Sequence, residues 1–139
     1  MERKHVLGLL AVILVVGVAL VYPRARWGVY AMAVDETLFK LDRFANPPDV
    51  LAMRDKLKEV GVTRYKLDPA SLTVDLRFEG KDMGPGGVWW YVHATVRQGG
   101  RTIEASPKRI ERAIGHDYIR ALEEGGVTVV MPGGGGGGG

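Results

Sequence analysis

SLTVDLRFEG, residues 71–80, alternates apolar and polar side chains along most of its length. Successive side chains of a β-strand point to opposite faces, so one face of this segment is apolar and the other is polar. The apolar set is Leu72, Val74, Leu76 and Phe78, and the polar set is Thr73, Asp75, Arg77 and Glu79. This pattern predicts a half-buried strand, with one face on the core and the other in water.

The residues that follow predict a hairpin. The glycine-rich loop KDMGPGG leads into VWWYVHATVRQGGRTIEAS, residues 88–106, which is expected to turn at Gly99-Gly100. A two-residue turn imposes the pairs Gln98–Arg101, Val96–Ile103, Ala94–Ala105 and Thr95–Glu104. Apolar residues meet apolar residues on one face of this hairpin, which supports the register.

Helical periodicity flanks the strands on both sides. Residues 23–44 place apolar side chains at spacings of three and four, and a second helix is expected from the cap Asn46 to a left-handed cap at Gly61. A third helix is expected over residues 106–126, weakened at Gly115, before the short strand VTVVMP. The sequence thus predicts an α+β fold, a small two-layer domain of three to four mostly antiparallel strands with helices on one face.

VLGLLAVILVVGVALVY, residues 6–22, contains no charged side chain. Its Leu, Val and Ile residues favour insertion into a bilayer by roughly 5 kcal/mol, which predicts an N-terminal transmembrane helix. A core helix and a cleaved secretory signal are the alternatives, but the run is longer than a typical signal core and no small-x-small cleavage site directly follows it. An uncleaved signal-anchor would give a single-pass protein of the cell membrane with its C-terminal domain outside the cytoplasm, although basic residues lie on both sides of the run.

The chain is expected to divide into four parts. Residues 1–22 form the membrane anchor helix, 23–46 an amphipathic juxtamembrane helix, 47–132 the small α+β domain and 133–139 a disordered poly-Gly tail. Basic and aromatic residues around the end of the apolar run are expected at the membrane interface. These residues are Tyr22, Arg24, Arg26, Trp27 and Tyr30.

The composition argues against several kinds of chemistry. The chain has no cysteine, and its 19 basic against 16 acidic residues give too small a surplus to predict a nucleic-acid partner. None of the three histidines has metal-ligand spacing, and the neighbours His116 and Asp117 lack a nucleophile. We therefore expect no catalytic residue, no metal site and no cofactor, and a protein that is not an enzyme.

One surface is a candidate for an interaction site. Trp89, Tyr91 and His93 alternate with apolar residues, so the hairpin places all three on the face away from the core. If helices cover the other face, these side chains meet solvent or a partner, and exposed Trp and Tyr are favoured as interface anchors. The alternative is that a helix, or the aromatic segment 27–30, covers them.

The layout of an apolar N-terminal helix, an amphipathic helix and a small α+β head resembles that of pilin-type subunits. That family carries a leader ending in Gly followed by Phe or Met, with Glu five residues into the apolar run. Here Leu9 follows Gly8 and Ile13 stands at the fifth position, so the processing motif is missing. The layout is equally similar to uncharacterised bacterial single-pass membrane proteins with a small extracytoplasmic domain. Neither resemblance implies a functional residue.

We expect a non-enzymatic single-pass membrane protein that acts by contact, as a structural or accessory subunit of a membrane or envelope assembly. Its expected partners are the lipid bilayer and proteins of the same complex. One alternative is a pilin-like filament subunit whose apolar helix packs against copies of itself. Another is an extracytoplasmic module that binds a small ligand or a lipid headgroup through the aromatic strand face.

Overall fold

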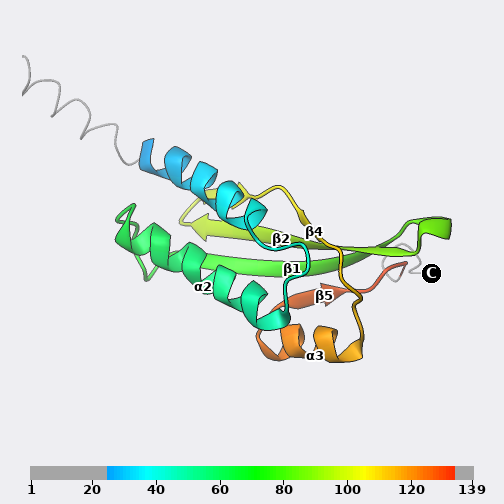
Figure 1. Ribbon diagram of the computed structural model, residues 1–139. Helices are drawn as coiled ribbons and strands as arrows, with labels where there is room; N and C mark the ends of the chain where they lie inside the picture. The colour runs from blue at the N-terminus through cyan, green and yellow to red at the C-terminus, as the bar shows by residue number, and fades with distance from the viewer. Residues whose placement is uncertain (1–24, 134–139) are drawn as a thin grey trace, which may run out of the picture.

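The alternating segment around Leu76 forms a long strand, and the other elements are arranged on it. The computed structural model describes residues 25–133. The elements in chain order are a helix over residues 25–39, called here the N-terminal helix, α2 (Pro47–Thr63), β1 (Leu72–Asp82), the 3₁₀ helix η1 (Gly84–Gly86), β2 (Val88–Gln98), β3 (Arg101–Glu104), β4 (Lys108–Ile110), α3 (His116–Glu124) and β5 (Thr128–Val130). The helices lie on one face of the sheet, which makes an α+β fold of two layers (Figure 1).

β1 and β2 form the centre of a five-stranded, mostly antiparallel sheet. β3 and β4 pair with successive parts of the free edge of β2, while β5 pairs in parallel with β1. The predicted hairpin register is confirmed, because Val96 lies opposite Ile103 and Thr95 lies opposite Glu104. The sheet has one strand more than the sequence predicts.

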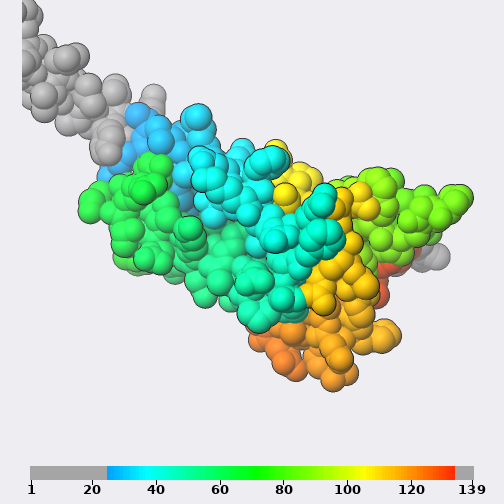
Figure 2. All heavy atoms as spheres, viewed as in Figure 1, coloured from blue at the N-terminus to red at the C-terminus, as the bar shows by residue number. Residues whose placement is uncertain are grey.

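The even-numbered residues of β1 and β2 face the helices. Phe78 and Val92 lie opposite each other on this face, and both are fully buried. Tyr30, Val34 and Leu38 recur every four residues on the N-terminal helix and are also fully buried, so this helix shares one core with the strands. Figure 2 shows the helical side, where the N-terminal helix and α2 lie next to each other and the tip of the β1–β2 hairpin extends beyond them.

α2 begins where the sequence predicts but does not end there. It begins after Asn46, whose backbone N–H donates a hydrogen bond to the Asp49 carboxylate at 3.1 Å. The predicted end at Gly61 is wrong, because the helix continues to Thr63. Gly61 is buried inside the helix, where a Cβ atom would lie 2.9 Å from Cδ2 of Leu72. This glycine therefore permits close contact between α2 and β1 rather than ending the helix.

The predicted helix over residues 106–126 is wrong in its first half. Residues Lys108–Ile110 form strand β4, and α3 begins only at His116, after Gly115. The exposed edge of β2 offers backbone hydrogen bonds to β4, whereas glycine disfavours helix by about 1 kcal/mol relative to alanine. The predicted end of the helix before Gly125 and the short final strand, β5, are both confirmed.

Within residues 25–133, no helix is both long enough and apolar enough to cross a membrane. For example, Glu36 in the last turn of the N-terminal helix and Lys40 just after it are exposed, and such charges are costly in the hydrocarbon of a bilayer. This finding contradicts three expectations: a fold with an N-terminal transmembrane helix, a single-pass protein with a signal-anchor, and a location in the cell membrane. These three predictions are wrong. The expected anchor, residues 1–22, and positions 134–139 of the expected tail lie outside the described residues.

Candidate binding face of the sheet

The odd-numbered residues of β1 and β2 point away from the helices. We call this side of the sheet the open face, because none of the helices in the described part of the chain lies over it (Figure 1). Its central residues are Asp75, Arg77, Glu79 and Lys81 on β1, Trp89, Tyr91, His93, Thr95 and Arg97 on β2, Glu104 on β3 and Arg109 on β4. Charged and aromatic side chains therefore cover the open face, whereas the opposite face is apolar.

Two aromatic rings of the open face each carry a cation. The guanidinium carbon of Arg109 lies 3.5 Å from the centroid of the Trp89 ring, and the Lys81 ammonium lies 5.2 Å from that of the Tyr91 ring. The ring quadrupole attracts such cations by about 0.5–1 kcal/mol at exposed sites. Because Arg109 belongs to β4 and Lys81 to β1, these contacts link both of these strands to the aromatic side chains of β2. The two rings are half-buried in consequence.

His93 is the next residue on this side of β2. Its Nε2 atom lies 3.1 Å from a carboxylate oxygen of Glu79, and the same oxygen lies 3.4 Å from Arg77 Nη2. Within residues 25–133, no hydrogen bond of good geometry forms at His93 Nε2. Burial lowers the pKa of His93 below its ordinary value of 6.5, the charges of Arg77 and Lys81 lower it further, and Glu79 raises it in part. The environment therefore favours the neutral imidazole.

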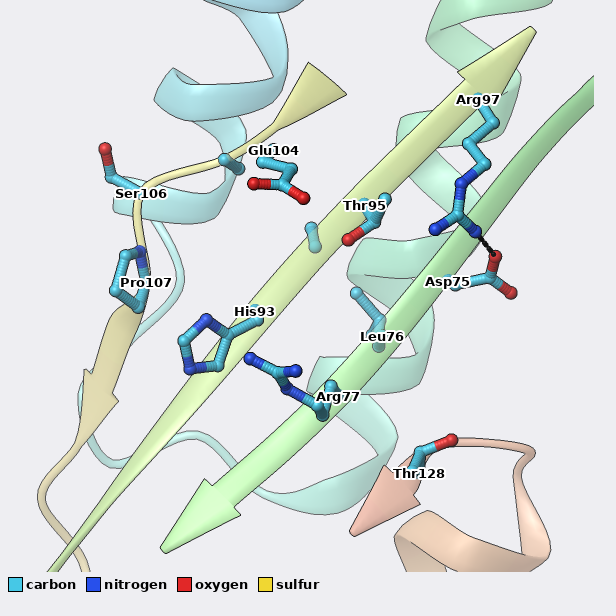
Figure 3. Close-up of a pocket in the computed structure, with 12 residues that line it drawn as sticks. Asp75, Leu76, Arg77, His93, Thr95, Arg97, Glu104, Ser106, Pro107 and Thr128 are labelled. Carbon is cyan, nitrogen blue, oxygen red and sulfur yellow. Dashed lines mark hydrogen bonds and ion pairs between the residues drawn. The ribbon is translucent and has the colours of Figure 1, made fainter. Parts of the chain in front are cut away.

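A pocket of about 440 Å³ lies on the open face beside His93. Figure 3 shows that Arg77 and His93 project from neighbouring strands, while Glu104 borders the pocket from β3. At one end Arg97 and Asp75 form an ion pair of 3.4 Å. Basic and acidic side chains are thus balanced around the pocket, which suits a ligand that carries both a positive and a negative group.

The expected interaction residues lie together. Trp89, Tyr91 and His93 follow one another on the open face, where the alternation of the sequence places them. The alternative that segment 27–30 covers them is wrong, because this segment packs on the opposite side of the sheet. Its tyrosine is fully buried there and donates a hydrogen bond to the Leu57 carbonyl at 2.7 Å.

Three of the residues expected at a membrane interface, Arg26, Trp27 and Tyr30, belong to the described part of the chain. Tyr22 and Arg24 lie outside the described residues. Arg26 donates a hydrogen bond to a backbone carbonyl after α2, and the Trp27 ring lies 6.0 Å from the ring of the buried Tyr30. The described members therefore contribute to the packing of the N-terminal helix on the domain.

The cations of the open face are not among the candidate site residues that the sequence predicts. Arg77 and Lys81 continue the polar alternation of β1, and the register places them opposite His93 and Trp89. Their position beside the aromatic residues follows from the antiparallel pairing of β1 with β2 across the loop KDMGPGG, which was not predicted. The position of Arg109 on this face was not predictable either, because its segment was expected in the helix over residues 106–126.

In the part of the chain that the structure describes, no three His, Asp or Glu side chains are grouped so that they could hold a metal ion. His116 and Asp117 are exposed at the start of α3. No protein-family model, no curated protein and no solved structure matches the chain, so the resemblance to pilin-type subunits stays a prediction.

Proposed function

We propose that the chain is a non-enzymatic binding subunit whose open face contacts a protein partner that presents acidic and apolar side chains. The observation that carries the proposal is the pair of aromatic rings with stacked cations, Trp89 with Arg109 and Tyr91 with Lys81. Trp, Tyr and Arg are the residues most enriched among those that dominate the energy of protein interfaces. Their position on a sheet face without a helix over it supports a role by contact.

The charges at this end of the sheet favour an acidic partner. The nearby carboxylates are already paired, since Glu79 contacts Arg77 and Glu111 contacts Arg109. Lys81 is exposed and makes no ion pair with any residue between 25 and 133. A carboxylate of the partner would gain an ion pair here and leave no new charge without a counterion.

An NMR titration of the full chain tests this proposal. The probe is a short peptide with glutamates on both sides of one phenylalanine, and the control probe carries lysines in place of the glutamates. We expect the glutamate peptide to shift the indole N–H signal of Trp89 and the backbone signals of Tyr91 and Arg109. We expect added salt to weaken the binding, because exposed charges are screened. The lysine peptide should leave these signals unchanged.

Two charge reversals distinguish the open face from the helical side. Lys81→Glu reverses an exposed charge beside the aromatic rings, and Lys58→Glu makes the same change on the exposed side of α2. We expect Lys81→Glu to weaken peptide binding about fivefold, in line with about 1 kcal/mol for one exposed ion pair, and Lys58→Glu to leave it unchanged. Equal losses in the two variants, or shifts confined to the helices, would contradict the proposal.

A second function is favoured by the pocket beside His93. Its volume of about 440 Å³ lies in the range of small-molecule sites, and its lining offers Arg77 to a carboxylate and Glu104 to an ammonium group. A free amino acid carries both groups, and L-alanine serves as the probe in the same titration. Saturable shifts at His93 and Thr95, without a shift at Trp89 and without any response to the glutamate peptide, would favour this function over a protein partner.

A further inference from the structure

Arg109 extends diagonally across the open face. The register places it directly opposite Tyr91, yet its guanidinium carbon lies over Trp89, 3.5 Å from the centroid of that ring. Trp89 is two positions away from Tyr91 on the same side of β2, and a long side chain spans the diagonal of about 7–8 Å between such neighbours. The Tyr91 ring is left to Lys81, which approaches it from β1 at 5.2 Å. The direction that Arg109 takes therefore decides which cation meets which ring.

Glu111 lies on the side to which Arg109 extends. It comes two residues after Arg109, so its side chain points to the same face of the sheet. The antiparallel pairing of Trp90 with Ile110 puts Glu111 at the level of Trp89. One carboxylate oxygen of Glu111 lies 3.5 Å from Arg109 Nη1.

Little else fixes the guanidinium of Arg109. Its Nε atom is buried and has no hydrogen-bond partner within residues 25–133. In the same part of the chain, no carboxylate other than that of Glu111 lies within ion-pair distance of Arg109. The ring of Trp89 attracts the cation but leaves it free to turn in its own plane. The carboxylate of Glu111 is therefore the contact that gives this guanidinium its direction.

Glu111 is itself held by Arg43, in the turn after the N-terminal helix. The second carboxylate oxygen of Glu111 lies 3.2 Å from Arg43 Nε, and the backbone N–H of Glu111 donates a hydrogen bond to the Arg43 carbonyl at 2.6 Å. Each oxygen of the carboxylate thus contacts a different guanidinium. A side chain whose own partners are fixed in this way positions the next group more precisely than a free one.

We propose that Glu111, held by Arg43, is a positioning residue of the open face: it keeps Arg109 over Trp89 and so sets how tightly an acidic and apolar partner binds. This inference rests on the proposed function. Trp and Arg are prominent among the residues that dominate interface energies. A long side chain that is already ordered loses less freedom when a partner binds, so its position before binding contributes to affinity.

The negative charge of Glu111 has the opposite effect on an acidic partner. The charge repels a carboxylate that approaches Arg109, so its removal alone would strengthen binding. The variant that separates the two effects is Glu111→Asp. It keeps the charge but is shorter by one methylene, so its carboxylate no longer spans the gap between Arg43 and Arg109. Glu123→Asp makes the same change on the exposed side of α3 and serves as the control.

NMR of the free chain gives the first test. The protons next to the Arg109 guanidinium lie over the Trp89 ring, whose ring current shifts their signals upfield. We expect Glu111→Asp to move these signals towards the positions of an unstacked arginine, and Glu123→Asp to leave them in place. The backbone signals of the helices should stay unchanged in both variants, which shows that the fold is intact. Unchanged Arg109 signals in Glu111→Asp overturn the proposal.

Titration with the glutamate peptide gives the second test. We expect Glu111→Asp to weaken binding about threefold, as the loss of a cation held over an exposed ring predicts, and Glu123→Asp to leave binding unchanged. If the unchanged chain fails to bind the peptide, the proposed function is overturned and this inference with it. If the unchanged chain binds, and Glu111→Asp loses the stack but not the affinity, the proposed function stands and this inference alone is overturned.

Arg43→Lys tests the other end of the contact. The Arg43 side chain is 63% exposed, and lysine keeps its charge but lacks the Nε group that contacts Glu111. We expect the Arg109 signals to move in the same direction and the peptide to bind about twofold more weakly. The control is Arg120→Lys, at an exposed residue of α3 that forms no ion pair within residues 25–133. Equal signals and affinities in Arg43→Lys and Arg120→Lys would overturn the role given to Arg43.

Discussion

The guanidinium of Arg109 stacks on the ring of Trp89 at 3.5 Å and links β4 to β2 on the open face. β4 has only three residues, so its backbone ladder with β2 is short. The stack adds a side-chain contact at the point where the sheet edge changes from β3 to β4. It also places a charged group over the face of the Trp89 ring.

This relationship predicts that Arg109→Lys is not a conservative change. Lysine keeps the charge but loses the planar group that stacks on the ring, so we expect the free energy of unfolding to fall by about 0.5–1 kcal/mol. Arg97→Lys is the matched control on the same face, because Arg97 forms an exposed ion pair with Asp75 and should cost less than about 0.5 kcal/mol. Urea unfolding followed by circular dichroism measures both values, and equal losses would show that the stack contributes nothing specific.

The environment of His93 predicts a loss of stability in mild acid. Burial, and then the charge of Arg77, lower the pKa of His93 in the folded state below its ordinary value of 6.5, so the unfolded chain binds the proton more readily. The resulting stability is present above pH 6.5 and is lost as the pH falls from that value through the lower pKa of the folded state. We expect the free energy of unfolding to decrease between pH 7.5 and pH 5.5 and to decrease less in His93→Gln.

Glu79→Gln provides the control for the pH experiment. The charge of Glu79 raises the pKa of His93, so its removal lowers that pKa further and should steepen the decrease in stability. The other two histidines are unchanged in every variant, and their contribution cancels in the comparison. A His93→Gln variant with the same pH dependence as the unchanged chain would contradict the role given to His93.

The sequence predicts the centre of the fold because the signals there are local. Strict alternation identifies β1, and the turn at Gly99-Gly100 fixes the register of β2 with β3. The same alternation places Trp89, Tyr91 and His93 on the open face. In these cases neighbours in the chain determine which side of the sheet a residue occupies.

The parts that were not predictable depend on contacts between distant residues. The strand state of Lys108–Ile110 is set by the edge of β2, and so short a segment alone does not distinguish a strand from a helix. The partner of Arg109 lies 20 positions away, so no local pattern indicates the stack on Trp89. The parallel pairing of β5 with β1 likewise depends on how α3 returns the chain to the sheet.

Two buried tyrosines predict late steps in an alkaline titration. Burial raises the pKa of Tyr30 and that of Tyr118 to about 12. Their hydroxyls donate hydrogen bonds to the carbonyls of Leu57, at 2.7 Å, and Ala45, at 2.8 Å. We expect absorbance at about 295 nm, which follows phenolate formation, to show that these two of the five tyrosines ionise well above the ordinary pKa of about 10.

The same tyrosines predict an effect on stability. Because the pKa is raised in the folded state, the stability that neutral Tyr30 and Tyr118 provide is present below pH 10 and is lost as the pH rises towards 12. Tyr30→Phe and Tyr118→Phe should each remove one late step and lower the free energy of unfolding by about 1 kcal/mol at neutral pH. A titration in which every tyrosine ionises near pH 10, while near-ultraviolet circular dichroism still reports the native fold, would contradict the burial of these residues.

Two helical glycines predict opposite effects of the same substitution. At Gly28 a Cβ atom meets nothing within 4 Å, so Gly28→Ala should raise the free energy of unfolding by up to about 1 kcal/mol through helix propensity. At Gly61 a Cβ atom would lie 2.9 Å from Leu72 Cδ2 and from Tyr30 Cζ. The hydrogen bond of the Tyr30 hydroxyl to α2 keeps that ring from moving away.

Overpacking of a buried site costs about 1–3 kcal/mol, which exceeds the gain from propensity, so we expect Gly61→Ala to lower the free energy of unfolding by about 1 kcal/mol. Urea unfolding of the two variants under identical conditions gives the comparison. The difference between them, about 2 kcal/mol, isolates the packing of α2 on β1 because the change in side chain is the same in both. If Gly61→Ala proved as stable as Gly28→Ala, the close approach of α2 to β1 at this position would be wrong.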